Sequence, residues 1–263
     1  MATNIHPTAV VDPNAKLEDG VEVGPYAIVG PDVTLGRGTK IWHHATVWGY
    51  TFVGADCEIY PYASVGMQTQ DLKFKGGRPG TRIGDRTVIR EYTSIHAATK
   101  DGDFTEIGDD NYFLAYCHVG HCCKIGNHLI ASNGATFAGH VVVEDHVTVG
   151  GGGTAIHQFC HMGAYSFVGG CSKVEQDVAP FLLADGNPAR VRIFNKVGLE
   201  RAGFDAERLK VVKYLFKSFY REGLNRQQAI DRVRGSEYAD TVDAKHFVDF
   251  VEKSERGLAA GMR

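Results

Sequence analysis

The chain has 263 residues, a formal net charge of −3 and 43% hydrophobic residues, the balance of a folded protein with a substantial core. No stretch approaches the roughly 18 consecutive apolar residues of a membrane span. The start MATNIHPTAV has neither the basic residues nor the apolar segment of a secretion signal. The six cysteines form no disulfide framework, which fits a reducing compartment. We therefore expect a cytoplasmic protein with no membrane insertion and no nucleic-acid partner.

A six-residue period governs the chain from Ile5 onward. The sequence divides into IHPTAV, VDPNAK, LEDGVE, VGPYAI and further units up to IYPYAS, and the phase resumes at Ile83 and Ile107. An aliphatic residue opens each unit, and a small or β-branched residue follows four places later. Such hexads are typical of a parallel β-helix, with three hexads in each triangular coil and coils stacked at about 4.8 Å. Proteins with this pattern form the left-handed version, an exception to the usual right-handed crossover.

We therefore predict a mainly β fold, a left-handed parallel β-helix of hexapeptide repeats over residues 1–190. A C-terminal α-helical domain should follow over residues 191–263. The register also gives four cysteines a structural explanation, because they stand in the small-residue position that elsewhere holds Ala, Thr or Val. These predicted core residues are Cys57, Cys117, Cys123 and Cys160.

Several histidines are predicted to share one face of the β-helix. Hexads that begin at residues spaced by multiples of 18 should lie on the same face, and these residues are Val65, Ile83, Val119 and Phe137. His121 and His140 are the third and fourth residues of two of these hexads, and His157 and Gln158 follow one coil later. Two interruptions of the repeat, residues 66–82 and 99–106, leave from the same face. Loops that break a solenoid on one side tend to mark its binding side, so this column is a candidate site.

After Val174 the hexads stop, and from about Asp205 the period becomes helical. Asp205 is a plausible N-cap, Gly223 a plausible end, and an apolar stripe lies between them at Leu209, Val212, Phe216 and Phe219. Shorter helices are predicted over 225–234 and 242–256, as a bundle that caps one end of the β-helix. Residues 196–263 carry a net charge of +3 against −6 for residues 1–195. This basic surface suits either an acidic partner or simple solvation of a helix face.

Eight local motifs together resemble one family. They are TQDLK at 69–73, IGDRTVIRE at 83–91, HVGH at 118–121, GATFAGHV at 134–141, AIHQFC at 155–160, VGGCSKVEQDV at 168–178, DGNPA at 185–189 and GLERAGF at 198–204. Over nearly all 263 residues the chain resembles the UDP-N-acetylglucosamine O-acyltransferases that open lipid A biosynthesis. The resemblance implies a homotrimer with sites between subunits. It also implies transfer of a 3-hydroxyacyl chain from acyl carrier protein to the sugar 3-hydroxyl, without cofactor or metal.

The same resemblance implies roles for individual residues. His121 would be the general base that takes the proton of the attacking sugar hydroxyl, a task that an imidazole can perform at neutral pH. The backbone N–H of Gly139 would stabilise the negative charge that develops on the thioester oxygen. His118 and His140 would contact sugar or phosphate groups. The other implied substrate contacts are Gln70, Asp71 and Lys73 in the first loop, His157 and Gln158 near the acyl and sugar region, and Asn195 and Arg201 at the nucleotide end.

Three positions depart from the family pattern. Cys122 stands where an Asp usually follows the catalytic histidine and holds its tautomer, and a thiol is a weak hydrogen-bond partner. The stretch GGGGTA at 150–155 is one residue longer than a hexad. Ala202 replaces one of two adjacent arginines expected near the nucleotide.

Other functions remain open at this point. A zinc enzyme of the carbonic-anhydrase type could use ligands from His118, His121, Cys122 and Cys123, but Cys123 should point into the core while Cys122 faces elsewhere. A related N-acyltransferase of the same pathway generally has an additional N-terminal domain. An acetyl-CoA-dependent acetyltransferase would not explain the TQDLK loop and the long tail. A purely structural β-helix would leave the histidine column without a role. Whether the acceptor is a 3-hydroxyl or a 3-amino group stays undecided.

Overall fold

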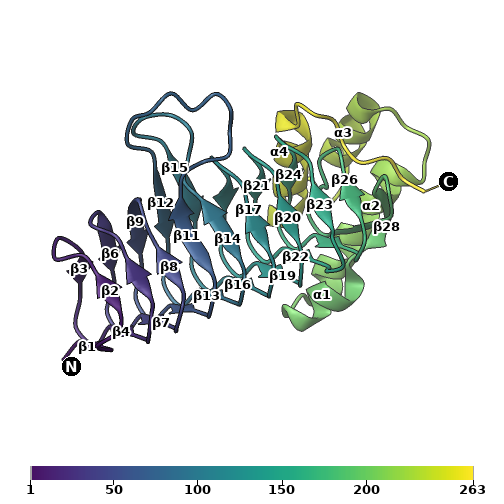
Figure 1. The fold of residues 1–263 in the computed structure, drawn as a ribbon. Coiled ribbons are helices and arrows are strands. Elements are labelled where there is room, and N and C mark those ends of the chain that lie inside the picture. The colour runs from purple at the N-terminus through teal and green to yellow at the C-terminus, as the bar shows by residue number, and fades with distance from the viewer. Residues whose placement is uncertain (1, 263) are drawn as a thin grey trace.

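A computed structural model describes residues 2–262, which form a left-handed parallel β-helix with helices beside its C-terminal end (Figure 1). Three parallel sheets make the three faces of a triangular prism. From β1 to β27, each strand pairs in parallel with the strand of the same face one coil away, and strands consecutive in the chain lie on different faces. The predicted fold class is confirmed.

The first sheet contains β1 (Asn4–Ile5), β4 (Glu22–Val23), β7 (Lys40–Ile41), β10 (Glu58–Ile59), β13 (Val88–Ile89), β16 (Tyr112–Phe113), β19 (Ile130–Ala131), β22 (Thr148–Val149), β25 (Phe167–Val168), β27 (Leu182–Asp185) and β28 (Arg190–Phe194). The second sheet contains β2 (Val10–Val11), β5 (Ile28–Val29), β8 (Thr46–Val47), β11 (Ser64–Met67), β14 (Ser94–His96), β17 (His118–Val119), β20 (Thr136–Phe137), β23 (Ala155–Ile156) and β26 (Lys173–Val174). The third sheet contains β3 (Lys16–Leu17), β6 (Val33–Leu35), β9 (Tyr50–Val53), β12 (Gly80–Ile83), β15 (Phe104–Ile107), β18 (Lys124–Ile125), β21 (Val142–Val143) and β24 (His161–Met162).

The first and fifth residues of each hexad point into the prism and make its core. Val119 and Cys123 illustrate the pattern, since both are fully buried. All four cysteines predicted in the small-residue position are buried, so that prediction is confirmed.

One face assignment from the sequence is wrong. Val65 pairs with Ile95, and Ile95 pairs with Val119, all on the second sheet. Ile83 lies instead on the third sheet, where it pairs with Ile107. The loop between β11 and β12 separates Val65 from Ile83, so counting the length of one coil across that loop does not return to the same face.

The corners of the prism carry side chains on a left-handed backbone. The fourth residue of a hexad turns the chain, and its φ is positive at Tyr62, Tyr92 and Tyr116, for example. Side chains from successive coils therefore stack, with ring centroids 5.1 and 5.0 Å apart along these three tyrosines. The corner between the second and third sheets carries Cys122 and His140 in the same way.

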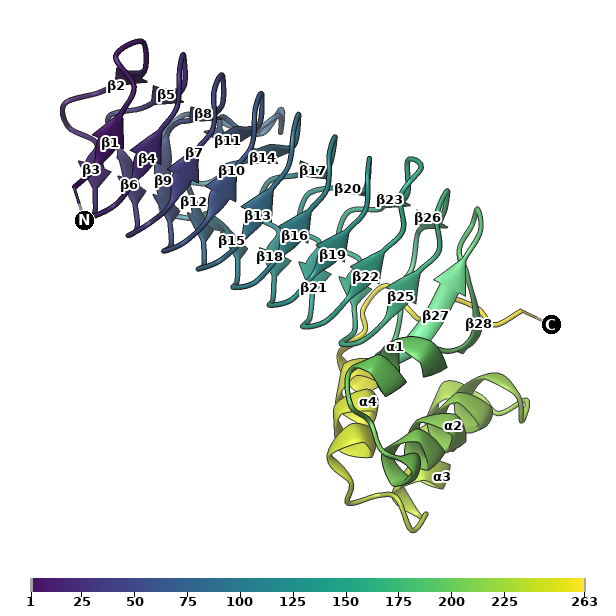
Figure 2. The same ribbon diagram turned by 90° about the horizontal axis from the view of Figure 1, so that it is seen from below.

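The helices lie beside the last coils (Figure 2). They are α1 (Lys196–Arg201), α2 (Ala206–Tyr220), α3 (Arg226–Arg234) and α4 (Val242–Lys253). Asp205 caps α2 as predicted, whereas α4 ends short of the predicted residue 256, and α1 was not predicted. The buried stripe of α2 is Val211, Val212, Leu215 and Phe216.

The end of the β-helix is covered by strands and the tail as well as by helices. β28 folds back antiparallel on β27 and completes the first sheet. Leu258 and Gly261 then form bridges to Asp177 and Val191. The expected capping of the end is thus shared, with the helices packed against the flank.

A half-buried carboxylate joins α4 to this flank. Glu144, next to β21, accepts the backbone N–H of Ala164 at 2.8 Å, and its Oε2 lies 2.8 Å from Nε2 of His246 on α4. Its Oε1 lies 3.4 Å from Nε2 of His161. Burial would raise the pKa of Glu144, but these three partners outweigh it and lower the pKa to about 2. The hydrogen bond to Glu144 raises the pKa of His246 above its ordinary value.

These shifts predict a pH window for the docking of α4. The contribution of Glu144 is present above its ordinary pKa of 4.5 and is lost as pH falls toward 2. The contribution of His246 is present below its ordinary pKa of 6.5 and is lost as pH rises through its raised pKa. In denaturant titrations, Glu144→Gln should lower the free energy of unfolding by about 1–3 kcal/mol between pH 4.5 and 6.5, and by less outside this range. Glu252→Gln, which removes an exposed ion pair with Arg234, is the control and should change little. Equal losses for both variants at every pH would contradict the assignment.

Candidate functional site

The two loops predicted to mark the binding side rise from one corner of the prism (Figure 1). One loop connects β11 with β12, and the other connects β14 with β15. Between them and the coils beyond lies a hollow of about 690 Å³. Asp71 and Lys73 line it from the first loop, and Cys122, His140 and Phe159 line it from three successive coils.

His121 precedes Cys122, which lines this hollow, and its own side chain is only 11% exposed. Its Nε2 lies 3.9 Å from Oδ2 of Asp71. The Asp71 carboxylate accepts the Lys73 backbone N–H at 3.0 Å and the Thr99 hydroxyl at 3.2 Å. The Lys73 N–H, above all, holds the pKa of Asp71 below its ordinary value. Asp71 therefore stays negative at neutral pH and places a carboxylate charge beside the His121 ring.

Gly139 lies directly beneath the ring of His121. A Cβ placed on Gly139 would approach Cε1 and Nε2 of His121 to 2.4 Å, well inside contact distance. The amide N–H of Gly139 finds no acceptor within residues 2–262. An unpaired main-chain donor thus lies beside the imidazole, which is the arrangement that oxyanion stabilisation needs.

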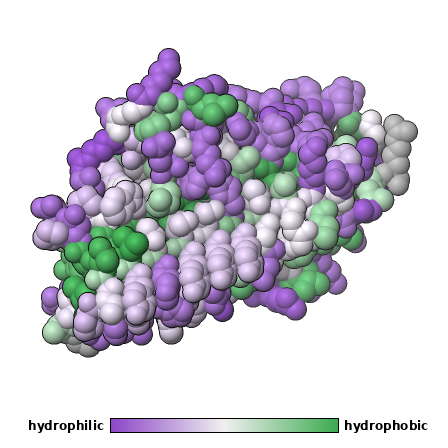
Figure 3. Space-filling view, in the orientation of Figure 1, coloured by the Kyte–Doolittle hydropathy of each residue, from purple (hydrophilic) through white to green (hydrophobic). Residues whose placement is uncertain are grey.

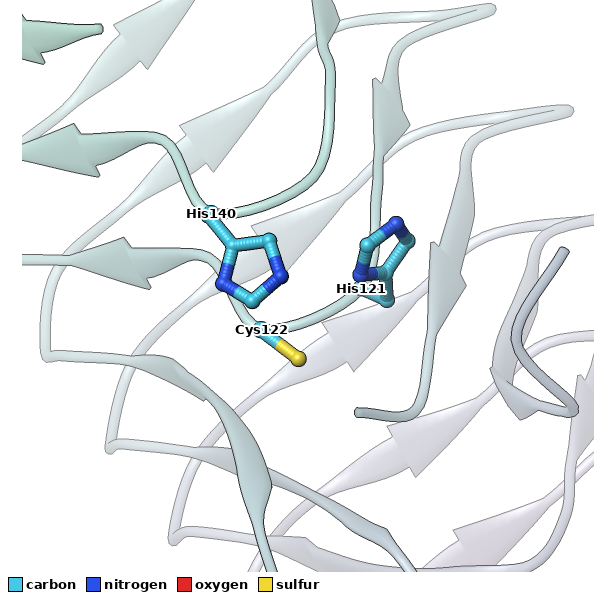
Figure 4. A group of neighbouring side chains, drawn as sticks. All are labelled: His121, Cys122 and His140. Atoms are coloured by element: carbon cyan, nitrogen blue, oxygen red, sulfur yellow. The ribbon is translucent and has the colours of Figure 1, made fainter. Parts of the chain in front are cut away.

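Among residues 2–262, the other nitrogen of His121 has no orienting partner. Nδ1 is buried and makes no hydrogen bond within the described part of the chain. Cys122, next in sequence, is positioned by its own backbone N–H, which donates to the Thr105 hydroxyl at 2.9 Å. Figure 4 shows the thiol near the rings of His121 and His140. Within residues 2–262, the Cys122 thiol therefore supplies no hydrogen bond to Nδ1 of His121.

A carboxylate at position 122 should improve His121 as a base, if His121 has the role that the sequence resemblance implies. Asp suits position 122, since Asp56 and Asp110 occupy the fourth hexad position with positive φ at another corner of the prism. We expect Cys122→Asp to raise kcat/KM by up to about tenfold, because a carboxylate would fix the tautomer of His121 and stabilise its imidazolium. Cys122→Asn, which has the same shape without the charge, is the control. A folded Cys122→Asp variant that is slower than the parent would contradict this expectation.

A second pair of histidines lies on the second sheet, His118 on β17 and His96 on the paired strand β14. The rings of His118 and His96 are 5.0 Å apart and edge to face, and Nδ1 of His118 lies 2.8 Å from the Ser94 hydroxyl. Burial, mainly, lowers the pKa of His118 to about 4 and also lowers that of His96. Both rings are therefore neutral hydrogen-bonding groups at physiological pH. Sequence reasoning missed His96, because no motif or register position distinguishes this residue at the buried end of β14.

The remaining predicted contacts fall into two places. His157 and Gln158 are exposed one coil beyond His140, whose ring stacks on Phe159 at 4.7 Å. Gln70 is exposed on the first loop. Asn195 and Arg201 line a different hollow of about 550 Å³, beside His128 and His146. Within one chain the structure therefore does not bring Asn195 and Arg201 to His121.

The additional residue in the GGGGTA stretch lies between these coils. Thr136 pairs with His118 on one side and with Ala155 on the other. The separation from Thr136 to Ala155 is one residue longer than the separation from His118 to Thr136. Gly152 and Gly153 take up the additional residue with positive φ. The bulge leaves the sheet pairing intact.

The prism of hexads, with its histidine-lined hollow, defines a hexapeptide-repeat transferase. The model of bacterial transferase hexapeptides matches residues 14–47. The model of domain 2 of UDP-N-acetylglucosamine O-acyltransferases matches residues 177–259.

Full-length relatives are more specific. The chain is 47% identical to an acyl-[acyl-carrier-protein]--UDP-N-acetylglucosamine O-acyltransferase of Burkholderia lata, over 97% of this chain and 99% of the relative. The solved UDP-N-acetylglucosamine acyltransferase from Campylobacter jejuni is similar with a TM-score of 0.92 at 35% identity, covering 98% and 100% of the two chains. That of Francisella novicida has a TM-score of 0.93 at 33% identity, covering 97% and 94%. The chain belongs to the family of acyl-[acyl-carrier-protein]--UDP-N-acetylglucosamine O-acyltransferases.

Proposed function

We propose that this protein transfers a 3-hydroxyacyl chain from acyl carrier protein to the 3-position of UDP-N-acetylglucosamine, the first step of lipid A biosynthesis, in the cytoplasm and without a cofactor. The observation that carries the proposal is the largely buried His121, which lies beside the Asp71 carboxylate and over the unpaired amide of Gly139. None of the helices within residues 2–262 is long and apolar enough to cross a membrane.

The proposed reaction needs no covalent intermediate on the enzyme. His121 accepts the proton of the sugar hydroxyl as its oxygen attacks the thioester carbonyl. The negative charge that forms on the carbonyl oxygen is met by the amide N–H of Gly139. The C–S bond then breaks, and the imidazolium returns the proton to the departing thiolate. Asp71 stabilises the transient positive charge on His121.

Substrate binding is assigned to the residues around this centre. In this proposal His118 and His140 contact the sugar and its phosphates, Gln70 and Lys73 hold the acceptor from the first loop, and His157 and Gln158 line the acyl and sugar region. Asn195 and Arg201 bind the diphosphate and nucleotide, a task that suits a guanidinium.

A homotrimer would complete the site. Asn195 and Arg201 lie in a hollow apart from His121 in one chain, so we propose that an adjacent subunit supplies them. The first coils present an apolar patch suited to subunit contact (Figure 3). Val10 and Ile28 are sheet neighbours there, with 63% and 37% of their surfaces exposed.

The direct test uses the purified protein with UDP-N-acetylglucosamine, its 3-amino analogue and a series of 3-hydroxyacyl carrier proteins. Mass spectrometry of the products identifies the acyl length and distinguishes an ester from an amide. Absence of any acylated UDP-sugar, or equal activity with acetyl-CoA, would contradict the proposed function.

The carrier protein is proposed to dock on the basic face of α2. Lys213 and Lys217 are exposed and form no ion pair among the described residues. They flank a hollow that also contains Ile193 and Phe216. Lys210 is less suitable because it pairs with Glu207 at 2.6 Å. Arg221 is less suitable because it donates to backbone carbonyls of Met262 and Arg192.

The corresponding prediction concerns the apparent affinity for the carrier. Changing Lys213 and Lys217 together to Glu should raise KM for the acyl carrier protein roughly threefold to tenfold at low salt, because exposed charge pairs are individually weak. KM for the UDP-sugar should stay nearly constant, and the effect should shrink at high salt. Lys245→Glu with Lys253→Glu on α4 makes the same change in net charge and is the control. An equal response of both double variants would mean that these lysines only solvate the helix.

A further inference from the structure

Three potential metal ligands converge at the edge of the hollow. One ligand atom each from His121, Cys122 and His140 lies within 4.8 Å of the other two (Figure 4). The sequence pattern correctly separated Cys122 from Cys123, because the Cys123 thiol is buried and donates to the Ala138 carbonyl. The third ligand comes instead from His140, one coil away.

The convergence is a product of the corner geometry. Cys122 and His140 are the fourth residues of hexads one coil apart, both with positive φ, so their side chains lie in one column. His121 precedes this column by one residue, and its ring meets that of His140 edge to face at 5.1 Å. Stacking on Phe159 and the Thr105 hydrogen bond hold His140 and the backbone of Cys122 in place. Such support limits the entropy lost when a cation orders the three side chains.

The ligand set selects a class of cation. Two imidazoles and one thiol suit borderline and soft divalent ions, above all Zn²⁺, and disfavour Mg²⁺ and Ca²⁺. Tetrahedral Zn²⁺ with bonds of about 2.0–2.3 Å sets its ligand atoms roughly 3.4–3.7 Å apart. The observed cluster needs to contract by about 1 Å to reach that spacing, which side-chain rotation can supply. The Asp71 carboxylate lies 3.9 Å from Nε2 of His121, the outer-shell place that carboxylates often take beside a ligating histidine.

We propose that His121, Cys122 and His140 form an inhibitory binding site for Zn²⁺ or a cation of similar chemistry. The inhibition, though not the binding, rests on the proposed function. A neutral imidazole has one N–H and one lone pair. Once the metal takes the lone pair of His121, the ring has no place for the proton of the sugar hydroxyl, whichever nitrogen is the ligand. The thiol of Cys122 loses its proton to solvent when the metal binds, and no redox step is involved.

Binding can be measured without any enzyme assay. Calorimetry with Zn²⁺ on the metal-free protein should show one site per chain, and Co²⁺ should give the charge-transfer absorption of a thiolate ligand. Cys122→Ser should abolish that absorption and weaken Zn²⁺ binding by at least about tenfold, since the loss of even an outer-shell partner costs about 10–100-fold in metal affinity. Cys171→Ser is the matched control, because Cys171 is the other exposed or partly exposed cysteine and also occupies a corner with positive φ. A Co²⁺ complex without thiolate absorption, or equal Zn²⁺ affinity of the parent and Cys122→Ser, would overturn the site.

Acyl transfer supplies the second measurement. Micromolar-range Zn²⁺ titrations should inhibit the parent and Cys171→Ser alike, with activity restored by a chelator. Relative to its own metal-free rate, Cys122→Ser should need at least about ten times more Zn²⁺ for half-inhibition. Thiolate-bound Co²⁺ without loss of acyl transfer would overturn the inhibitory role. A protein that binds Co²⁺ through the thiolate but transfers no acyl chain when metal-free would refute the proposed function and leave the site standing.

Discussion

Replacing His121 with alanine should lower the rate of acyl transfer by about 10²–10⁴-fold, the range that a general base contributes. The physical reason is that the sugar hydroxyl is a poor nucleophile at neutral pH until its proton has an acceptor. The loss should appear in kcat with little change in KM for either substrate, because the imidazole acts on the transition state. Steady-state kinetics on the purified variant measures both quantities.

The control for this variant is His43→Ala. His43 occupies the third position of its hexad, as His121 does, but lies between β7 and β8, away from the two loops. It should retain the parental rate. Circular dichroism and the oligomeric state must match the parent in both variants. A folded His121→Ala protein with near-normal turnover would remove His121 from the mechanism.

Gly139→Ala should have the second largest effect, a loss of about 10²-fold. The new methyl group would lie 2.4 Å from the ring of His121, so the ring must move by about 1 Å, and such a displacement can cost 10²-fold in rate. The same methyl group would crowd the carbonyl oxygen that the Gly139 amide is proposed to receive. Kinetics at saturating concentrations of both substrates reports the change in kcat.

A double-mutant cycle separates these two explanations. In a His121→Ala background the ring is absent, so the methyl group of Gly139→Ala has nothing to displace. If Gly139 acts only by positioning His121, the second substitution should cost little in that background. If the amide also binds the oxyanion, a residual loss should remain. Fully additive losses would contradict the positioning role.

Most of the β-helix could be predicted from the sequence because its core is strictly periodic. The first and fifth residues of a hexad have no alternative to burial, so Val119 and Cys123 were assigned correctly from position alone. The N-cap Asp205 could be predicted equally well, because the hydrogen bond from the Arg208 backbone N–H to its side chain is local in sequence.

The assignment of faces failed where the loops interrupt the coils. Val65 pairs with Ile95, and Ile95 pairs with Val119, although both sequence separations are longer than an undisturbed coil. Each separation exceeds the length of a coil by a whole number of hexads. The insertions therefore keep the six-residue phase but move the following hexads to another face. Counting by 18 residues consequently places Ile83 on the second sheet, although it lies on the third.

The residues of the site could be predicted only in part from the sequence, again because the loops do not follow the repeat. The column of His121 and His140 follows from the repeat. The approach of Asp71 to His121 depends on how an aperiodic loop folds back, through its hydrogen bonds with Lys73 and Thr99. The absence of a partner for Nδ1 of His121 among the described residues is likewise a property of the packed structure.

Because the parallel strands β1 to β27 pair only with strands one coil away, resistance to local opening is uneven along the molecule. Each coil is held only by its two neighbours, and β1, β2 and β3 have a neighbour on one side alone. Their residues are exposed or half-buried, whereas the inward residues from β4 onward are buried. Amide hydrogens should therefore exchange fastest in the first coil and more slowly toward the middle. At the other end, the bridges of Leu258 and Gly261 fasten the last coils. Fraying of the first coil would leave the hollow around His121 undisturbed, because opening cannot reach it without breaking the intervening coils in turn.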